Sequence, residues 1–314
     1  MRAILACVLA LSALSLGCAV TPAVQYERTT FEGFDVISYL PVQPRGLVFL
    51  FHGSGGSASF ADRVETTDVL NRLIAQGYGF VSTSSTERTG DRRWDAANPS
   101  LTTNPDLARL ARLRAHLVDT TAMTSSTPLV GIGMSNGARF VTLWGQTWKA
   151  AGFPVKAIWA SMGRIAGPVS GPGQLTVPTV FSTAENDFTS PPGPIILDFD
   201  QTRRAGTPTE LYVSRERRLT AAPYLRIPGV DQAEADEVVR RLKASGVWNA
   251  DGTRIVADDQ EAAARAGAVA MPASVAAQAN EIRSETAVVL AVHQFTAEYA
   301  AQVQAFFARF VPGG

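Results

Sequence analysis

The stretch TPLVGIGMSNGARF, residues 127–140, places one serine between two glycines directly after an apolar run. The apolar residues favour a buried strand, and a helical pattern begins at Asn136. A serine in an ordinary loop needs no flanking glycines. A serine on a sharp turn from a strand into a helix does need them, because neighbouring backbone passes close on both sides. The pattern G-x-S-x-G at 133–137 therefore predicts a strained turn that presents the Ser135 hydroxyl at the end of a strand.

Strands and helices alternate along the chain on both sides of this turn. Continuous apolar runs are typical of strands covered on both faces, whereas residues 26–41 show the period of two expected of a hairpin. Alternation of this kind predicts an α/β protein with a mostly parallel sheet and helices on both faces. The predicted strands are 45–53, 78–86, 127–133, 155–163, 177–184 and 209–215, and the predicted helices are 64–76, 104–123 and 136–151, with a further one beginning near Ile196.

Size and composition describe an ordinary globular protein. The 314 residues are 46% hydrophobic and 18% charged, and their formal net charge is zero. A neutral chain lacks the positive field that attracts nucleic acid, so we expect no nucleic-acid partner. Lysine is rare and occurs only at 149, 156 and 243. This bias toward arginine reflects either a GC-rich genome, the interpretation we favour, or an arginine-lined surface for carboxylates.

The first residues predict export. A short positive start precedes the apolar stretch AILACVLALSALSLGCA, which is too short for a convincing membrane span. LSLGC resembles the bacterial lipoprotein box, in which Cys18 would be lipidated, and cleavage near Ala19 or Ala23 is the alternative. We therefore expect residues 1–18 to be a signal peptide and the protein to be periplasmic, attached to the outer membrane, or secreted. Cys7 would leave with the signal, so the mature chain is expected to have no intramolecular disulfide.

A serine hydroxyl becomes a strong nucleophile only when a base takes its proton and a third group orients that base. The chain offers three histidines as the base. His52 directly follows a predicted strand, which favours a structural role, and His116 lies inside a predicted helix. His293 is late in the chain and precedes a helical pattern over 294–310. The alternative for His293 is a place inside one long helix from 274 to 310, since no Gly or Pro interrupts AVVLAVHQF.

Several of these motifs together resemble the α/β-hydrolase superfamily: a strand leading into HGSGG at 52–56, the strand–serine–helix turn, the acid-bearing loop FSTAENDFTSPP, and a late histidine. HGSGG with GMSNGARF looks most like the branch of secreted polyhydroxybutyrate depolymerases and feruloyl or acetyl-xylan esterases. The resemblance covers about residues 45–215 and 288–312. It implies the α/β-hydrolase fold, with a mostly parallel sheet, helices on both faces and a helical insertion before the catalytic histidine.

The superfamily orders its catalytic residues as serine, acid and histidine along the chain. The resemblance therefore implies that Ser135 is the nucleophile, His293 the base and Asp187 the acid that orients it. Glu185 is the near alternative for the acid, and Asp198 and Asp200 are remote ones. It also implies an oxyanion hole made by the backbone N–H groups of Ser54 and Asn136. No cofactor and no metal ion is implied.

The segment 216–287 is predicted to be a helical insertion between the core segments 26–215 and 288–314. Because α/β sheets bind ligands at the carboxyl ends of their strands, we expect the insertion to lie there as a lid or substrate region. Trp94 is predicted at the cleft rim, where its ring would lie against a substrate, with a half-buried anchoring role as the alternative. The arginines predicted to bind anionic substrates are Arg217, Arg218, Arg240 and Arg241.

The favoured function is an exported serine hydrolase that cleaves carboxylic esters, small or polymeric, through an acyl-enzyme on Ser135. One alternative is an amidase- or peptidase-type depolymerase of an anionic polyamide such as polyaspartate. Another is a non-catalytic surface lipoprotein on a hydrolase scaffold, against which the retained serine, acid and late histidine argue. The sequence leaves open the acyl and alcohol groups of the substrate and the oligomeric state.

Overall fold

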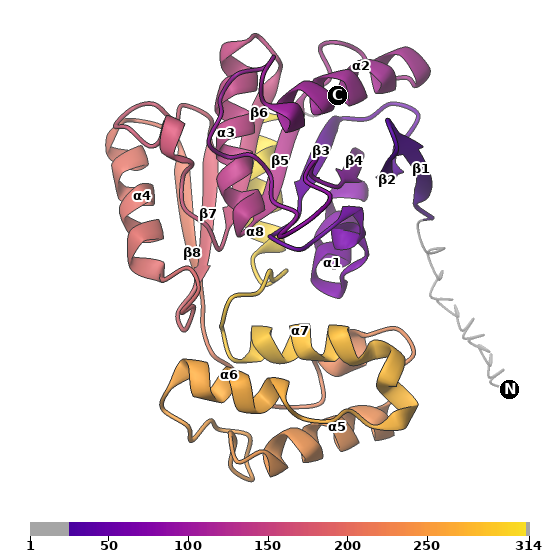
Figure 1. Cartoon of the computed structure of the whole chain (residues 1–314), viewed down its shortest axis with the longest axis vertical. Coiled ribbons are helices and arrows are strands. Elements are labelled where there is room, and N and C mark those ends of the chain that lie inside the picture. Colours follow the sequence, from indigo (N-terminus) through magenta and orange to yellow (C-terminus); the bar gives the residue numbers. More distant parts are fainter. Residues whose placement is uncertain (1–24, 312–314) are drawn as a thin grey trace, which may run out of the picture.

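A twisted eight-stranded sheet forms the centre of the protein (Figure 1). The computed structural model describes residues 25–311, and the predicted signal peptide with Cys18 lies outside these residues. β1 pairs antiparallel with β2, β2 pairs antiparallel with β4, and the other neighbours are parallel. In sheet order the strands are β1 (Glu27–Phe31), β2 (Phe34–Tyr39), β4 (Tyr78–Thr83), β3 (Gly46–Phe51), β5 (Leu129–Met134), β6 (Val155–Ser161), β7 (Thr179–Ala184) and β8 (Thr209–Ser214).

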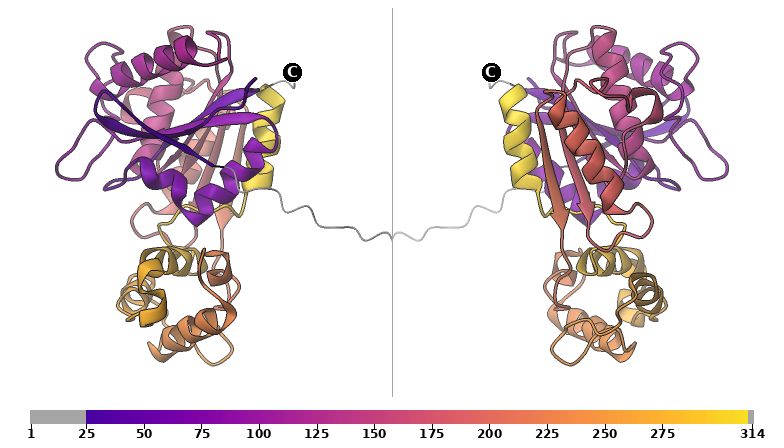
Figure 2. Two further views of the ribbon diagram at one scale, coloured as in Figure 1. Left: turned by 90° about the vertical axis from the view of Figure 1, so that its right-hand side faces the viewer. Right: turned by 90° about the vertical axis from the view of Figure 1, so that its left-hand side faces the viewer.

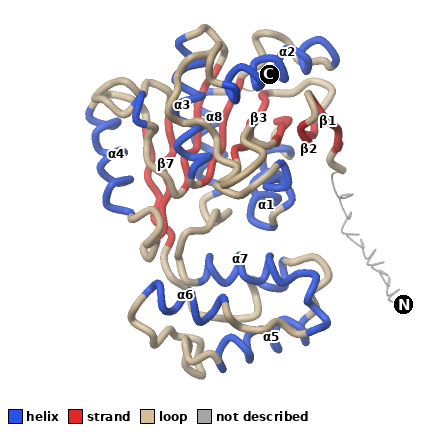
Figure 3. Tube along the Cα trace, in the orientation of Figure 1, coloured by secondary structure: helices blue, strands red, loops and turns tan. Residues whose placement is uncertain are grey.

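Helices cover both faces of the sheet, because successive side chains of its central strands point to opposite sides. On β3, Phe49 and Phe51 pack against the helices of one face, whereas Val48 and Leu50 pack against those of the other. The first face carries α2 (Pro105–Thr120), α3 (Asn136–Ala150) and α4 (Pro192–Arg204), and the second carries α1 (Val64–Ile74) and α8 (Ala300–Phe310) (Figure 3). The predicted layered α/β arrangement is confirmed.

Local sequence signals set several element ends. The hairpin predicted over residues 26–41 is formed by β1 and β2 and turns at Glu32 and Gly33, both with positive φ. The Asn104 side chain accepts hydrogen bonds from the N–H groups of Asp106 and Leu107 and so begins α2. Two predicted boundaries are wrong. Helix α4 begins at Pro192, before Ile196, and the last helix begins at Ala300 rather than at 294.

The segment after β8 forms a separate helical lobe beyond the carboxyl end of the sheet (Figures 1 and 2). It contains α5 (Gln232–Ala244), α6 (Asp259–Gly267) and α7 (Ala279–Val289). The lobe has its own apolar core, which includes Tyr224, Leu242 and Ile282. It is joined to α1 by ion pairs from Arg226 to Glu65 and from Arg63 to Glu281. Within residues 25–311, no helix combines the length and apolar character needed to span a membrane.

Candidate active site

Ser135 occupies a strained turn between β5 and α3. Its φ of 58° and ψ of −117° are rarely adopted by residues other than glycine, and such a backbone costs about 1–3 kcal/mol. The flanking glycines are required because neighbouring backbone passes close to both of them. A Cβ on Gly133 would collide with the Gly137 carbonyl, and a Cβ on Gly137 would collide with the Phe51 carbonyl. The strained turn that the sequence predicts is therefore present. It places the serine hydroxyl at the carboxyl end of β5.

A hydrogen-bonded chain joins the serine to a histidine and a carboxylate from distant parts of the sequence. The Oγ of Ser135 lies 2.8 Å from Nε2 of His293, and Nδ1 of His293 lies 2.7 Å from Oδ2 of Asp187. The Asp187 side chain is fully buried, and its Oδ1 accepts hydrogen bonds from the N–H groups of Thr189 and Ser190. Because Nδ1–H donates to the carboxylate, Nε2 is left to accept the serine proton.

The structure therefore has four features in one arrangement: this strand order, a serine turn after β5, an acid after β7 and a histidine before the last helix. This is the α/β-hydrolase fold. In this fold, the carboxyl ends of the central strands carry the site, which is where the Ser135 turn lies.

The other acids that the sequence offered have different partners. Glu185 accepts hydrogen bonds from the backbone N–H of Glu216 and from Arg215. Asp198 binds Arg164 through both carboxylate oxygens, and Asp200 pairs with Arg203 and Arg204. Only Asp187 of these four reaches His293.

The other two histidines are also accounted for. His52 is buried; its Nδ1–H donates to the Gly53 carbonyl and its Nε2 accepts from the N–H of Ser85. Burial lowers the pKa of His52 to about 4, so its imidazole is neutral and structural. His116 is exposed on α2, where it packs beside Phe31.

A loop, not a helix, carries His293. Helix α7 ends at Val289, and Ala291 has a φ of 50°, which breaks the long helix that was the alternative. Asn186, the residue before Asp187, holds this loop in place. Its backbone N–H donates to the Ala291 carbonyl, and its side chain donates to the Leu290 carbonyl. Sequence reasoning missed Asn186, since its partners lie more than a hundred residues away.

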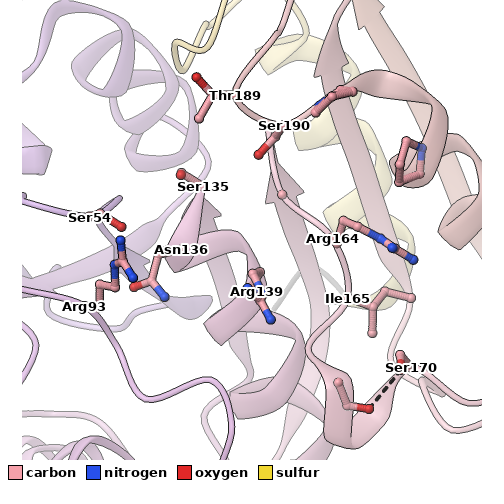
Figure 4. Close-up of a pocket in the computed structure, with 14 residues that line it drawn as sticks. Ser54, Arg93, Ser135, Asn136, Arg139, Arg164, Ile165, Ser170, Thr189 and Ser190 are labelled. Carbon is pink, nitrogen blue, oxygen red and sulfur yellow. Dashed lines mark hydrogen bonds between the residues drawn. The ribbon is translucent and has the colours of Figure 1, made fainter. Parts of the chain in front are cut away.

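The two residues predicted to form the oxyanion hole both line the same cleft as Ser135 and lie near one another in it (Figure 4). Asn136 is the first residue of α3, so its N–H has no acceptor within the helix. Ser54 follows β3, and the glycine before it is needed there, because a Cβ on Gly53 would press against Met134 and Ser135. The cleft can thus present backbone donors beside the serine hydroxyl.

Trp94 does not line this cleft, which corrects its predicted place at the rim. The ring is only 2% exposed, stacks on Phe140 at 4.9 Å and meets the edge of Phe51. Its Nε1–H donates to the His52 carbonyl. Its backbone exchanges two hydrogen bonds with the Asn136 side chain. Trp94 therefore anchors its loop to the first turn of α3.

The four arginines predicted to bind substrate also lie outside this cleft. Each faces a carboxylate of its own surroundings: Arg217 faces Glu298, Arg218 faces Asp251, and Arg240 and Arg241 share Glu237. None of them lines the cleft at Ser135, and neither does any other residue of 216–287.

The cleft has a volume of about 680 Å³, and the charged side chains that line it are all basic. Its side chains include three arginines that sequence reasoning did not select, and among the lining residues there is no Asp or Glu. A metal site is not formed by the part of the chain that the structure describes, where His, Cys, Asp and Glu do not gather in groups of three. The lining residues are Ser54, Arg93, Ser135, Asn136, Arg139, Gly163, Arg164, Ile165, Gly167, Ser170, Thr189, Ser190, Pro191 and Pro194.

No protein-family model matches the sequence, and no curated protein matches it either. Solved structures resemble the chain at low identity. A thermostable esterase matches with 14% identity and a TM-score of 0.46 over 61% of this chain, which spans 55% of that protein. A carboxylesterase from Mesorhizobium loti matches with 16% identity and a TM-score of 0.45 over 69% of this chain and 98% of that one. Est1E from Butyrivibrio proteoclasticus, solved with ferulic acid, matches with 12% identity and a TM-score of 0.43 over 60% and 89%.

Proposed function

We propose that this protein is a serine hydrolase that cleaves carboxylic esters through an acyl-enzyme on Ser135. One observation carries the proposal: the unbroken chain from Ser135 Oγ to His293 to the buried Asp187, opening into a cleft with backbone donors beside it. Nε2 of His293 lies at hydrogen-bond distance from the Ser135 hydroxyl, as a general base requires, and Nδ1 lies at hydrogen-bond distance from the Asp187 carboxylate that orients the ring.

The first half of the reaction forms the acyl-enzyme. His293 Nε2 takes the proton of Ser135 as Oγ bonds to the ester carbonyl carbon, and the carbonyl electron pair moves onto oxygen. The N–H groups of Ser54 and Asn136 stabilise that oxyanion. When the tetrahedral intermediate collapses, the carbon–oxygen bond to the alcohol breaks, and His293 gives its proton to the leaving oxygen.

The second half consumes one water. His293 takes a proton from water as the water oxygen attacks the acyl carbon, and the second tetrahedral intermediate expels Ser135 Oγ, which receives that proton. The products are one carboxylic acid and one alcohol. Throughout, the Asp187 carboxylate holds Nδ1–H, so that the imidazole keeps its orientation and the imidazolium is stabilised.

Labelling and turnover together test the proposal. A fluorophosphonate should label wild-type protein at Ser135, and 4-nitrophenyl acetate should be hydrolysed. Ser135→Ala should abolish both, with a loss of turnover on the order of a millionfold, as for nucleophile deletions in other serine hydrolases. A protein that neither reacts with the probe nor turns over any ester would instead be a non-catalytic scaffold. Cleavage of polyaspartate without cleavage of esters would favour the amidase.

We also propose that the protein is exported, on the strength of its first eighteen residues. Cell fractionation with mass determination of the mature chain tests this. Acylation lost in Cys18→Ser would assign a lipoprotein, whereas an unmodified chain beginning near Ala19 or Ala23 would assign a cleaved secretory protein.

A further inference from the structure

The cleft beside Ser135 concentrates positive charge. Arg93, Arg139 and Arg164 all line it, and no acidic side chain does. Figure 4 shows Arg139 and Arg164 on one side of Ser135 and Arg93 on the other, near Ser54. Such a cleft raises the local concentration of anions and disfavours cations.

Two of the three arginines form ion pairs with acidic side chains outside the cleft lining. Arg164 donates to the buried Asp198 from Nε at 3.1 Å and from Nη2 at 2.7 Å, which fixes the guanidinium while half of the side chain stays exposed. Arg93 pairs with Asp91, and both are largely exposed. These two pairs are therefore close to neutral, although Nη1 of Arg164 remains available as a donor.

Arg139 is different. Within residues 25–311 it makes no ion pair, and its side chain is exposed. It lies in the first turn of α3, where its backbone N–H donates to the Ser135 carbonyl, and its side chain lines the cleft. The positive end of the α3 dipole adds to its field. The cleft that contains Ser135 thus also holds one guanidinium without an ion-pair partner among the described residues.

We propose that the cleft selects esters that carry a carboxylate a few bonds from the scissile bond, with Arg139 as the principal anchor and Arg164 as a second donor. This rests on the proposed function and names its substrate class. A planar guanidinium binds a carboxylate through two parallel hydrogen bonds, which makes arginine a specific anchor rather than a diffuse charge. The hydroxyls of Ser170 and Ser190, which also line the cleft, can add further donors.

Two matched substrate pairs test this proposal and locate the anionic group. On the acyl side, 4-nitrophenyl hemiadipate is compared with 4-nitrophenyl hexanoate. On the alcohol side, 4-acetoxybenzoate is compared with 4-acetoxybenzamide. The measured quantity is the ratio of kcat/KM for the anionic ester to that for its neutral partner. In wild type at least one ratio should exceed one, and it should fall as ionic strength rises.

Arg139→Gln should lower that ratio by about ten- to a hundredfold, the usual effect of a charge-assisted hydrogen bond. Arg139→Lys should keep the charge but lose the paired geometry and give an intermediate ratio. Arg240→Gln is the matched control, because Arg240 is exposed, pairs with Glu237 and lies outside the cleft. It should leave both ratios unchanged.

The outcomes separate this inference from the proposed function. If both ratios are unchanged in Arg139→Gln while Ser135→Ala abolishes turnover, the anion site is wrong and the esterase assignment stands. If no ester is turned over at all, calorimetry on Ser135→Ala decides the anion site alone. Tighter binding of adipic acid monoanilide than of hexananilide, or of 4-acetamidobenzoate than of 4-acetamidobenzamide, lost on adding Arg139→Gln, supports the site. Equal binding within both pairs overturns it.

Discussion

A buried acidic cluster between α1 and the helical lobe should make the stability of the protein depend on pH. Glu285 on α7 and Glu65 on α1 are both nearly inaccessible and share one cation, Arg226. Arg226 lies 2.7 Å from Glu65 and 3.4 Å from Glu285, and it also binds Asp68. Oε1 of Glu285 has no hydrogen-bond partner among the described residues, as expected of a carboxyl that is not fully compensated when charged.

Burial, and after it the Glu65 carboxylate, raise the pKa of Glu285 from 4.5 to about 8. Between those two values the folded protein holds a proton that the unfolded chain has released, so the contribution of Glu285 to stability falls as pH rises through this window. One extra bound proton corresponds to a slope of about 1.4 kcal/mol per pH unit. Each kcal/mol lowers Tm by about 2–4 °C in domains of 150–250 residues, so one pH unit in this window corresponds to a fall of about 3–6 °C.

Glu285→Gln should remove this dependence, because the amide mimics the protonated acid and cannot ionise. The variant should match wild type near pH 5 and exceed its Tm by about 7–14 °C at pH 8. Thermal unfolding measured at half-unit steps from pH 5 to 8 checks this. Glu261→Gln, at an exposed position on α6 paired with Arg265, is the control and should follow wild type. Equal slopes in wild type and Glu285→Gln would refute the reasoning.

Three further predictions concern the site. His293→Ala should lower kcat by about 10⁴- to 10⁶-fold and His116→Ala should be nearly silent, so equal losses in steady-state kinetics would count against His293 as base. Asp187→Asn should lower kcat by about 10⁴-fold while a fluorophosphonate still labels Ser135 slowly, and a comparable loss in Glu185→Gln instead would assign the acid two residues earlier. Asn186→Ala should destabilise the protein by about 1–2 kcal/mol and lower kcat more than it changes KM, because the Leu290 carbonyl loses its donor and the His293 loop loosens. Denaturant unfolding measures the loss of stability, and steady-state kinetics measures kcat and KM. An unchanged kcat would show that Asn186 does not position the histidine.

Residues close in sequence carried most of the information about the fold. The serine turn could be predicted because its causes are local: a strand, two glycines that allow backbone to approach, and a helix start. The hairpin at Glu32 and Gly33 and the cap at Asn104 are local for the same reason. Chain order and the resemblance to the superfamily pointed to His293 and Asp187, but spacing alone could not choose them, since 158 and 106 residues separate His293 from Ser135 and Asp187.

By itself, then, the sequence determined the alternation of strands and helices, the strained turn at Ser135 and a short set of residues that could act with it. Tertiary structure alone decided which charges are free and which side chains are reachable. Trp94 is buried because Phe51 and Phe140 surround it, and the arginines of the lobe are neutralised by nearby carboxylates. Arg139 has no ion-pair partner among the described residues, although it lines the same cleft as Ser135. Whether a charge is paired and whether a side chain is buried both depend on neighbours in space. The order of residues along the chain does not specify those neighbours.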